Sequence, residues 1–270
     1  MNGWLPALIA FALMLIAGGS GALLARRLPE DFVSEPSMKN LRIGMALVGT
    51  MASLLLGLMI NSARYTFSEA YLDVQKYAAA IQLTDQELLH YGGERACVIR
   101  GTLQTYMKQV IGGTWNPSNR SPNETTDPSL AALLQFHSEV RTLEASNDGQ
   151  KRGHDTLLSL SRQLMEYHWK VSGEASSVTP TIFIAVVIGW YCLIFWYLGV
   201  FAPPNPVVFA GQVLAMVAIS GAIFLVNEMG EPFSGPVKVS SAPLARLFER
   251  MEAEACPEDA AVLSPSSPSG

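Results

Sequence analysis

The chain has 270 residues, a formal net charge of −5, and 49% hydrophobic against 15% charged residues. It has no basic patch interleaved with aromatic residues, which argues against nucleic acid as a partner. Its three cysteines, Cys97, Cys192 and Cys256, lie far apart. This odd, scattered set argues against a disulfide framework and lacks the spacing of a zinc site.

Long uncharged stretches indicate a membrane protein. No Asp, Glu, Lys or Arg occurs from Ala175 to Asn227, and a proline-rich turn at 202–206 divides this run. A membrane-spanning helix needs about 20 mostly apolar residues. Residues 181–201 and 207–227 each meet that criterion, as do about 3–25 and 43–63. The sequence therefore predicts an all-α, multi-pass protein of the cell membrane, with four transmembrane helices in a lipid bilayer.

The first of these stretches, within residues 1–63, has one alternative interpretation, which is a cleaved signal peptide. No basic side chain precedes the apolar run, and the run is too long for the hydrophobic region of a signal peptide. We therefore expect it to remain as a transmembrane helix.

Residues 64–180 are predicted to form a helical extramembrane domain inserted between the second and third transmembrane helices. No Gly or Pro occurs from Asn61 to Tyr91, so the second helix should continue beyond the membrane until Gly92 and Gly93 end it. Apolar periodicity predicts further helices over 94–111, 130–140 and 157–165. Residues 147–149 are predicted as a turn, and Thr179 as the N-cap of the third transmembrane helix within 181–228.

The C-terminal region divides into two parts. Residues 229–255 are predicted as a turn at the membrane edge followed by an amphipathic helix that begins near Ser241–Pro243. Residues 256–270 are rich in Pro and Ser and are predicted to be disordered.

The distribution of Lys and Arg bears on orientation. More basic residues flank the central domain and the fourth span than occupy the connection 26–42, which favours cytoplasmic placement of the central domain and both termini. The high density of charge in that short connection favours the reverse. We adopt the cytoplasmic assignment as the prediction.

A row of small residues marks the second transmembrane helix. Gly49, Ser53 and Gly57 recur every four residues, and Asn61 continues the row. Small residues let another helix approach closely, so the row is typical of packing against a neighbouring span. Alternatively, copies of this helix from several subunits surround an axis, with the small residues lining a lumen and Leu, Met and Phe67 forming constrictions.

A second candidate site follows the fourth span. Glu228 and Glu231 stand one turn apart at the predicted membrane edge, followed by Pro232, Phe233 and Gly235. These acids indicate either an acidic ring at a cation or regulatory site, or simply the point where the chain leaves the bilayer. We favour the second interpretation because residues that flank spans commonly mark the interface.

The sequence gives no positive sign of enzymatic chemistry. Glu87 and His90 have the Glu-x-x-His spacing of di-iron bundles, but those need two such motifs and two more glutamates. No nucleotide-binding, nucleophile-elbow or zinc-protease motif is found. We therefore expect no catalytic, cofactor-binding or metal-binding residues, and a protein that is not an enzyme.

Four segments together resemble a family of largely bacterial membrane proteins called bestrophin-like. They are Leu54–Leu58, then Leu88–Gly92 with Arg100 and Leu103, then Trp190–Phe195, and finally Phe224–Gly235 followed by Ser240–Leu244. The last is the most specific, since the family pattern there is Glu-Leu-Asp-x-Pro-Phe-x-Gly followed by Ser-x-x-Pro-Leu. Here Met229, Gly230 and Glu231 replace the commoner residues. The resemblance covers about Leu41 to Met251.

The resemblance implies a more distant likeness to bestrophins, which are pentameric anion channels with a long cytosolic helical region between spans two and three. It thus implies a homo-oligomeric ion channel with span two nearest the axis. The acidic run of the calcium-gated members is replaced here by 236–240, so calcium gating is not implied. The competing hypothesis is a non-conducting membrane sensor or scaffold whose helical domain binds a partner protein.

Overall fold

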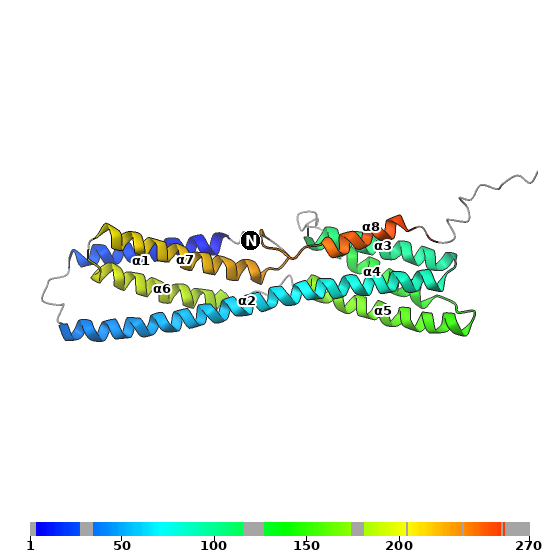
Figure 1. Ribbon diagram of the computed structural model, residues 1–270, viewed down its shortest axis with the longest axis horizontal. Coiled ribbons are helices and arrows are strands. Elements are labelled where there is room, and N and C mark those ends of the chain that lie inside the picture. Colours follow the sequence, from blue (N-terminus) through cyan, green and yellow to red (C-terminus); the bar gives the residue numbers. More distant parts are fainter. Residues whose placement is uncertain are drawn as a thin grey trace, which may run out of the picture. The chain divides into compact units, whose positions relative to one another are not determined.

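In the computed structural model, the described residues are 4–27, 35–115, 127–173, 181–203, 205–233, 235–254 and 256. Across these ranges the secondary structure consists of eight α-helices (Figure 1). Their bounds are α1 (Trp4–Ala25), α2 (Glu35–Tyr91), α3 (Glu94–Trp115), α4 (Pro128–Arg141), α5 (Asp148–Gly173), α6 (Thr181–Phe201), α7 (Pro206–Gly230) and α8 (Ala242–Ala253).

The helices form two compact units. The apolar unit lies within residues 1–68 and 177–238 and contains α1, the N-terminal part of α2, α6 and α7. The bundle unit lies within residues 69–176 and 239–270 and contains the rest of α2 together with α3, α4, α5 and α8. The helix α2 belongs to both because no Gly or Pro interrupts it from Asn61 to Tyr91, as the sequence predicts.

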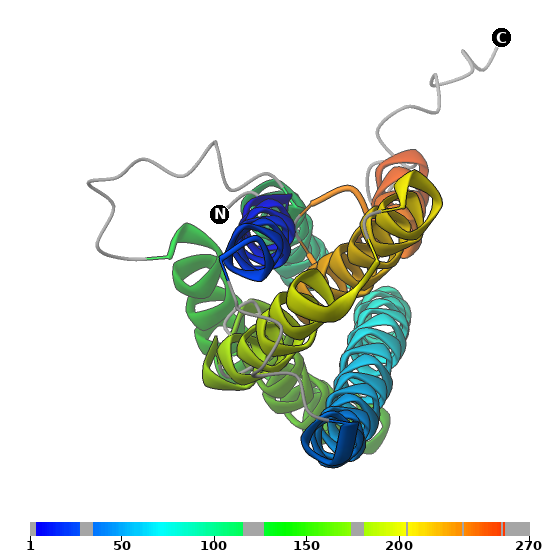
Figure 2. The same ribbon diagram turned by 90° about the vertical axis from the view of Figure 1, so that its left-hand side faces the viewer.

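The apolar unit has a core but leaves much apolar surface uncovered. Figure 2 views the apolar unit with α1, α2, α6 and α7 toward the reader. Each of these helices is long and apolar enough to cross a membrane, and at most 28% of each apolar stretch is buried. Large side chains such as Leu8, Ile16, Leu58 and Leu214 are mostly exposed. Exposing so large a contiguous apolar surface to water is energetically unfavourable, whereas contact with the hydrocarbon chains of lipids is not.

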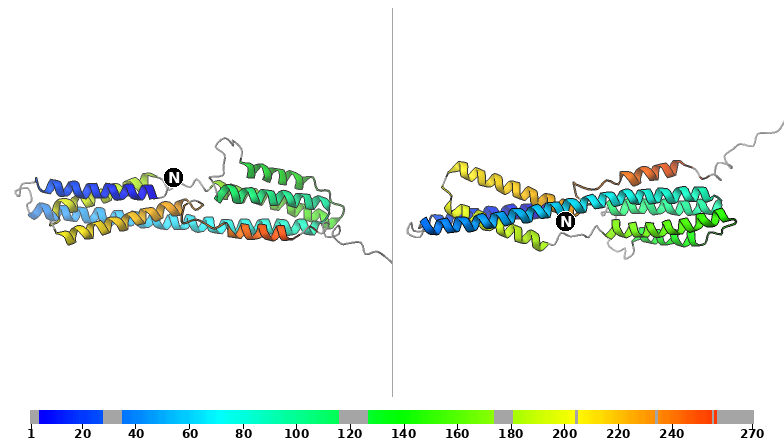
Figure 3. Two further views of the ribbon diagram at one scale, coloured as in Figure 1. Left: turned by 90° about the horizontal axis from the view of Figure 1, so that it is seen from above. Right: turned by 60° about the horizontal axis from the view of Figure 1, so that its bottom comes forward.

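The bundle unit has a conventional buried core. Helices α3, α4, α5 and α8 run alongside the C-terminal part of α2 (Figure 3). Within this unit α3 lies against both α4 and α8, and α4 lies against α5. The largest buried side chains come from α2 to α5, namely Tyr77, Ile81, Leu88, Ile99, Leu103, Tyr106, Met107, Leu133, Phe136, Leu157 and Leu164.

Local signals account for several helix ends. Gly92 and Gly93 terminate α2 with φ of 71° and 88°, a conformation that residues with a Cβ rarely adopt. Asp127 caps α4 by accepting a hydrogen bond from the Ser129 N–H at 3.0 Å. Asn205 caps α7 in the same way through the Val207 N–H at 2.9 Å, with proline at the first helical position.

Several predicted boundaries are wrong. The helix predicted over 94–111 continues through Gly112 and Gly113 to Trp115. The second helix begins at Glu35, so the predicted connection 26–42 already includes its first turns; residues 39–42 hold no helix breaker. Asp148 and Gly149 lie in the first turn of α5, because Asn147 caps that helix by accepting the Gln150 N–H at 2.8 Å. The predicted N-cap Thr179 and the tail after residue 256 lie outside the described residues.

Candidate functional site

Most of the small-residue row of α2 is exposed on the surface of its own unit. Ala52, Leu56, Met59 and Ala63 are the buried residues of this part of α2, and they pack into the core formed by α1, α6 and α7. Ser53, Gly57 and Asn61 are exposed and Gly49 is partly exposed. A Cβ at Gly57 would meet no atom within 4 Å beyond its own helix backbone. A Cβ at Gly49 would lie 3.8 Å from Ile194 Cδ1 of α6, an ordinary contact distance. Within the described part of the chain, the row therefore meets another helix only at Gly49, and the exposed positions from Ser53 onward do not pack α2 against one.

The row borders a shallow groove. Gly49 and Ser53 line it together with Tyr191 and Ile194 of α6, and its volume is about 620 Å³. The hydroxyl of Ser53 donates to the Gly49 carbonyl at 2.8 Å, and that of Thr50 donates to the Ala46 carbonyl at 2.9 Å. Because these hydroxyls already have backbone acceptors, they can lie against either lipid or water at little cost.

The turn after α7, which the sequence predicts to lie at the membrane edge, is folded around a buried carboxylate. Glu228 is 3% exposed, and its Oε2 atom accepts no hydrogen bond from the residues that the structure describes. Gly235 has a φ of 81°, and a Cβ there would lie 3.0 Å from the carboxyl carbon of Glu228. Pro232 and Phe233 are buried as well, whereas Glu231 is partly exposed. The turn thus packs its own residues over Glu228 instead of presenting that acid on the surface.

The Glu-x-x-His spacing gathers no ligand cluster. No group of three or more His, Cys, Asp or Glu side chains close enough to hold a metal ion occurs among the described residues. His90 is exposed and Glu87 is only partly buried.

A buried chain of polar side chains, which no sequence pattern predicted, crosses the bundle unit. The hydroxyls of Tyr77 on α2 and Tyr106 on α3 are hydrogen-bonded, and Tyr106 Oη lies 3.2 Å from His168 Nδ1 on α5. His168 Nε2 is 4.0 Å from the Asp127 carboxylate at the start of α4. Burial raises the pKa of both tyrosines, so their hydroxyls stay protonated. These three side chains are at most 1% exposed, so the chain ties four helices together and offers no site open to a substrate.

The cysteine prediction is wrong for two of the three residues. Cys97 on α3 and Cys256 after α8 form a disulfide with a Cα–Cα distance of 6.0 Å, and only Cys192 is free. Spacing along the chain did not reveal the pair, because α8 packs antiparallel on α3 and brings residues that are 159 positions apart side by side. Only the tertiary fold creates this proximity.

The comparisons with known proteins bear on the helical layout. A family model described as "Bestrophin-like domain" matches residues 11–244. The chain belongs to the bestrophin-like family. The resemblance seen in the sequence is thereby confirmed, and this bestrophin-like protein is a membrane protein.

Solved structures share the fold. Two crystal structures of single-substitution variants of a bacterial bestrophin homologue from Klebsiella pneumoniae resemble this chain with TM-scores of 0.66 and 0.64, at 14% and 13% identity. The alignments cover 92% of this chain and 97% and 96% of theirs. A variant described only as a membrane protein has a TM-score of 0.62 at 13% identity, covering 92% of this chain and 95% of its own. Among curated protein sequences, none matches this chain significantly.

Proposed function

We propose that this bestrophin-like protein is a homo-oligomeric anion channel, with α2 of each subunit nearest the axis. Helices α1, α2, α6 and α7 would be the four membrane spans, with the helices of the bundle unit inserted between the second and third. The observation that carries the proposal is the row Gly49, Ser53, Gly57 and Asn61 on α2, of which Ser53, Gly57 and Asn61 are exposed among the described residues. Family membership supports it as well.

The two exposed faces of α2 differ in a way that suits this arrangement. One bears the small residues, whereas another bears Met51 and Leu58, which are 52% and 67% exposed. Small side chains leave room for a lumen when several copies of a helix surround an axis, and large apolar ones suit lipid or a neighbouring subunit. Larger side chains near the row, such as Phe67, would form constrictions that close by dewetting.

Anion preference follows from the charges at the two ends of the row. Arg42 and Arg64 are each eleven residues from Ser53, and eleven residues are close to three helical turns. Because of this spacing, both arginines fall on the same face of α2 as Ser53, and both are exposed. In an oligomer each end of the lumen would carry a ring of guanidinium groups, which attracts anions and repels cations.

The deciding experiment measures size and flux together. The purified protein should run in detergent as an oligomer larger than a dimer and should pass chloride when reconstituted in liposomes. Ser53→Leu should narrow the lumen and reduce flux, whereas Leu58→Phe, on the other exposed face, should leave it unchanged. A monomer or dimer without flux would contradict the proposal and favour the non-conducting sensor or scaffold.

The charge rings have a test of their own. Arg42→Gln and Arg64→Gln together should lower the ratio of chloride to sodium permeability without changing oligomer size. The matched control is Arg162→Gln, which removes an exposed arginine from α5 in the bundle unit. Equal permeability ratios in the three proteins would contradict a role of these arginines in selectivity.

We also propose that the bundle unit and both termini face the cytoplasm, on the distribution of basic residues. A fluorescent protein fused after Gly270 should then be fluorescent, and alkaline phosphatase fused at the same point should be inactive. The opposite pair of results would reverse the orientation and leave the channel proposal intact.

A further inference from the structure

A segment at the C-terminal end of the chain is fastened along α3. We call residues 239–256, which include α8, the C-terminal strap. At its beginning, the indole Nε1 of Trp115 donates to the Val239 carbonyl at 2.7 Å. Near its end, Gln104 Nε2 donates to the Met251 carbonyl at 3.0 Å. Leu244, Leu247 and Met251 bury the apolar face of α8 between these points.

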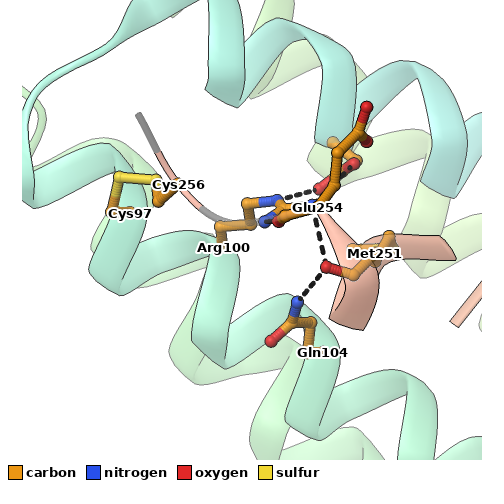
Figure 4. Close-up of polar contacts among 7 residues, drawn as sticks. Cys97, Arg100, Gln104, Met251, Glu254 and Cys256 are labelled. Atoms are coloured by element: carbon orange, nitrogen blue, oxygen red, sulfur yellow. Dashed lines mark hydrogen bonds and ion pairs between the residues drawn. A yellow bond between two sulfur atoms is a disulfide. The ribbon is translucent and has the colours of Figure 1, made fainter. Parts of the chain in front are cut away.

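Arg100 of α3 fixes the last turn of α8 (Figure 4). Its Nη1 donates to the Glu254 carbonyl at 2.6 Å, and its Nη2 donates to the Met251 carbonyl at 3.0 Å. The carbonyls at a helix C-terminus lack intrahelical partners and carry partial negative charge, so a guanidinium group both satisfies and stabilises them. Asp85 holds Arg100 in place through its Oδ1 atom, 2.6 Å from Arg100 Nε.

The disulfide lies just beyond this cap. Cys97 precedes Arg100 by one helical turn on α3, and Cys256 follows Glu254 by two residues (Figure 4). Cys97 is partly exposed, whereas Cys256 is 9% exposed. Cys97 is therefore the more accessible residue of the pair for a thiol from solution.

We propose that the Cys97–Cys256 bond is a thiol-responsive clasp, whose redox state sets how firmly the end of the C-terminal strap is held on α3. The proposal rests on the proposed cytoplasmic placement of the bundle unit. Disulfides in the reducing cytosol are usually transient and redox-sensing, whereas those in oxidising compartments are structural. A pair of this kind on the cytoplasmic side therefore opens and closes.

The chemistry is thiol–disulfide exchange with a dithiol protein of the Cys-x-x-Cys class. A thiolate of that protein attacks Cys97 Sγ, the Sγ–Sγ bond breaks, and Cys256 leaves as a thiolate that takes up a proton. The second thiolate of the reductant then attacks the mixed disulfide and releases Cys97, so two electrons pass to the clasp and the reductant becomes a disulfide. Closure runs in reverse, with the disulfide form of such a protein or glutathione disulfide as the oxidant.

Opening the clasp leaves the non-covalent contacts in place. The Arg100 and Gln104 bonds to the last turn of α8 remain, as does the Trp115 bond at the other end. Reduction should therefore loosen the end of the C-terminal strap without unfolding the bundle unit. Residues 231–238 connect the strap to α7, and the Trp115 bond to Val239 holds the strap at that end in both redox states.

The first test counts thiols in the full-length protein in lipid nanodiscs equilibrated with glutathione buffers. The oxidised protein should react with a maleimide at one cysteine, Cys192, after denaturation, and the fully reduced protein at all three. The transition should fall within the range that mixtures of reduced and oxidised glutathione span. Cys192→Ser should lower both counts by one and leave the transition unchanged. A bond that never forms under oxidising glutathione would overturn the proposal.

The second test measures hydrogen–deuterium exchange with and without a dithiol reductant. Reduction should raise exchange several-fold in residues 248–254 and leave α4 and α5 unchanged. Cys256→Ser should show the raised exchange without reductant, and Cys192→Ser should behave as wild type. Equal exchange in the oxidised and reduced proteins would overturn the clasp.

The third test asks on which side of the membrane the Cys97–Cys256 bond lies in cells. Intact cells are treated with a membrane-impermeant reductant. Acid then stops thiol–disulfide exchange, and the free thiols of the protein are counted. A clasp in the cytoplasm should not respond to this reductant but should respond to a permeant one. A bond that is oxidised in cells and is opened by the impermeant reductant overturns the proposal, because it identifies a structural disulfide outside the cytoplasm. Chloride flux from purified protein is independent of that result.

Discussion

Arg100 shows how one buried side chain joins distant parts of the bundle unit. It is 4% exposed, and its guanidinium group bonds Asp85 of α2 as well as two carbonyls at the end of α8. An ion pair in such a place gains little over an apolar pair of similar size, because both charges are removed from water. Removing only one of the two charged side chains destabilises the fold far more, because the remaining charge stays buried without its partner.

We therefore expect Arg100→Gln to lower the free energy of unfolding by about 3–5 kcal/mol. Denaturant unfolding of the protein in detergent would measure the change. The double variant Arg100→Gln with Asp85→Asn should lose less than the sum of the two single variants, because it leaves no orphaned charge. Lys170→Gln, which removes an exposed cation 2.9 Å from Glu166, serves as the control and should have no measurable effect. Similar losses for Arg100→Gln and Lys170→Gln would contradict this account.

His137 makes the stability of the bundle unit depend on pH. Burial, together with the cations of Arg141 and Arg162, lowers the pKa of His137 below its ordinary value of 6.5. The unfolded chain therefore binds more protons than the folded one between these two pKa values. The contribution of neutral His137 to stability is fully present above about pH 6.5 and is lost as the pH falls through the folded-state pKa.

The expected effect is a decrease in melting temperature of the wild type on acidification from pH 7.5 to 5.5 that is smaller in His137→Gln. The glutamine keeps a polar partner for Ser161, which lies 2.8 Å from His137 Nδ1. The side chain is partly exposed, so the difference between the two proteins should be at most about 1 kcal/mol. The comparison is made at both pH values because other groups titrate in both proteins alike. A parallel decrease in both proteins would show that His137 is not responsible.

Among the elements, α1 and α6 make the closest crossing in the apolar unit. A Cβ at Gly199 of α6 would lie 3.0 Å from the carbonyl carbon of Gly18 and 3.1 Å from the amide nitrogen of Ala22 on α1. At Gly21 of α1, a Cβ would likewise meet the backbone of α6. Glycine is thus required on both helices, because the obstacles are backbone atoms that cannot move aside. Close approach of this kind is the main source of affinity between helices in lipid.

Gly199→Ala should therefore separate α1 from α6 and lower the stability of the protein in detergent by about 1–3 kcal/mol. Gly189→Ala is the matched control on the same helix, since a Cβ there meets nothing within 4 Å. That variant should be neutral or slightly stabilising, because alanine favours the helix over glycine. The melting temperatures of the two variants, measured by thermal unfolding in the same detergent, test this expectation. Equal melting temperatures would mean that α1 and α6 do not cross here.

At the scale of the whole molecule, the features that depend on neighbouring residues could be predicted and those that depend on distant ones could not. The unbroken α2 up to Tyr91 follows from the absence of Gly and Pro, and its end follows from Gly92 and Gly93. The Cys97–Cys256 pair and the Arg100 contacts join positions far apart in the chain, and no local pattern encodes them.

The small-residue stripes show the same limit. The sequence pointed to the row on α2 as a place where another helix packs or a lumen forms. The structure puts the close helix crossing instead at Gly18, Gly21 and Gly199, and leaves Ser53, Gly57 and Asn61 of the α2 row exposed. A row of small residues indicates close approach, but only the fold decides which row is used within the chain and which remains for other partners.

The exposed row on α2 predicts a pattern of water access in the assembled protein. In a variant lacking all three native cysteines, Ser53→Cys and Gly57→Cys should react with a charged, membrane-impermeant thiol reagent in nanodiscs. Met51→Cys and Leu58→Cys should not react, because they face lipid or a neighbouring subunit, where the reactive thiolate does not form. Ala52→Cys, at a position with no exposed surface, is the control for burial inside the chain. Reaction on both exposed faces would place α2 in water throughout, and reaction on neither would leave no aqueous lumen beside it.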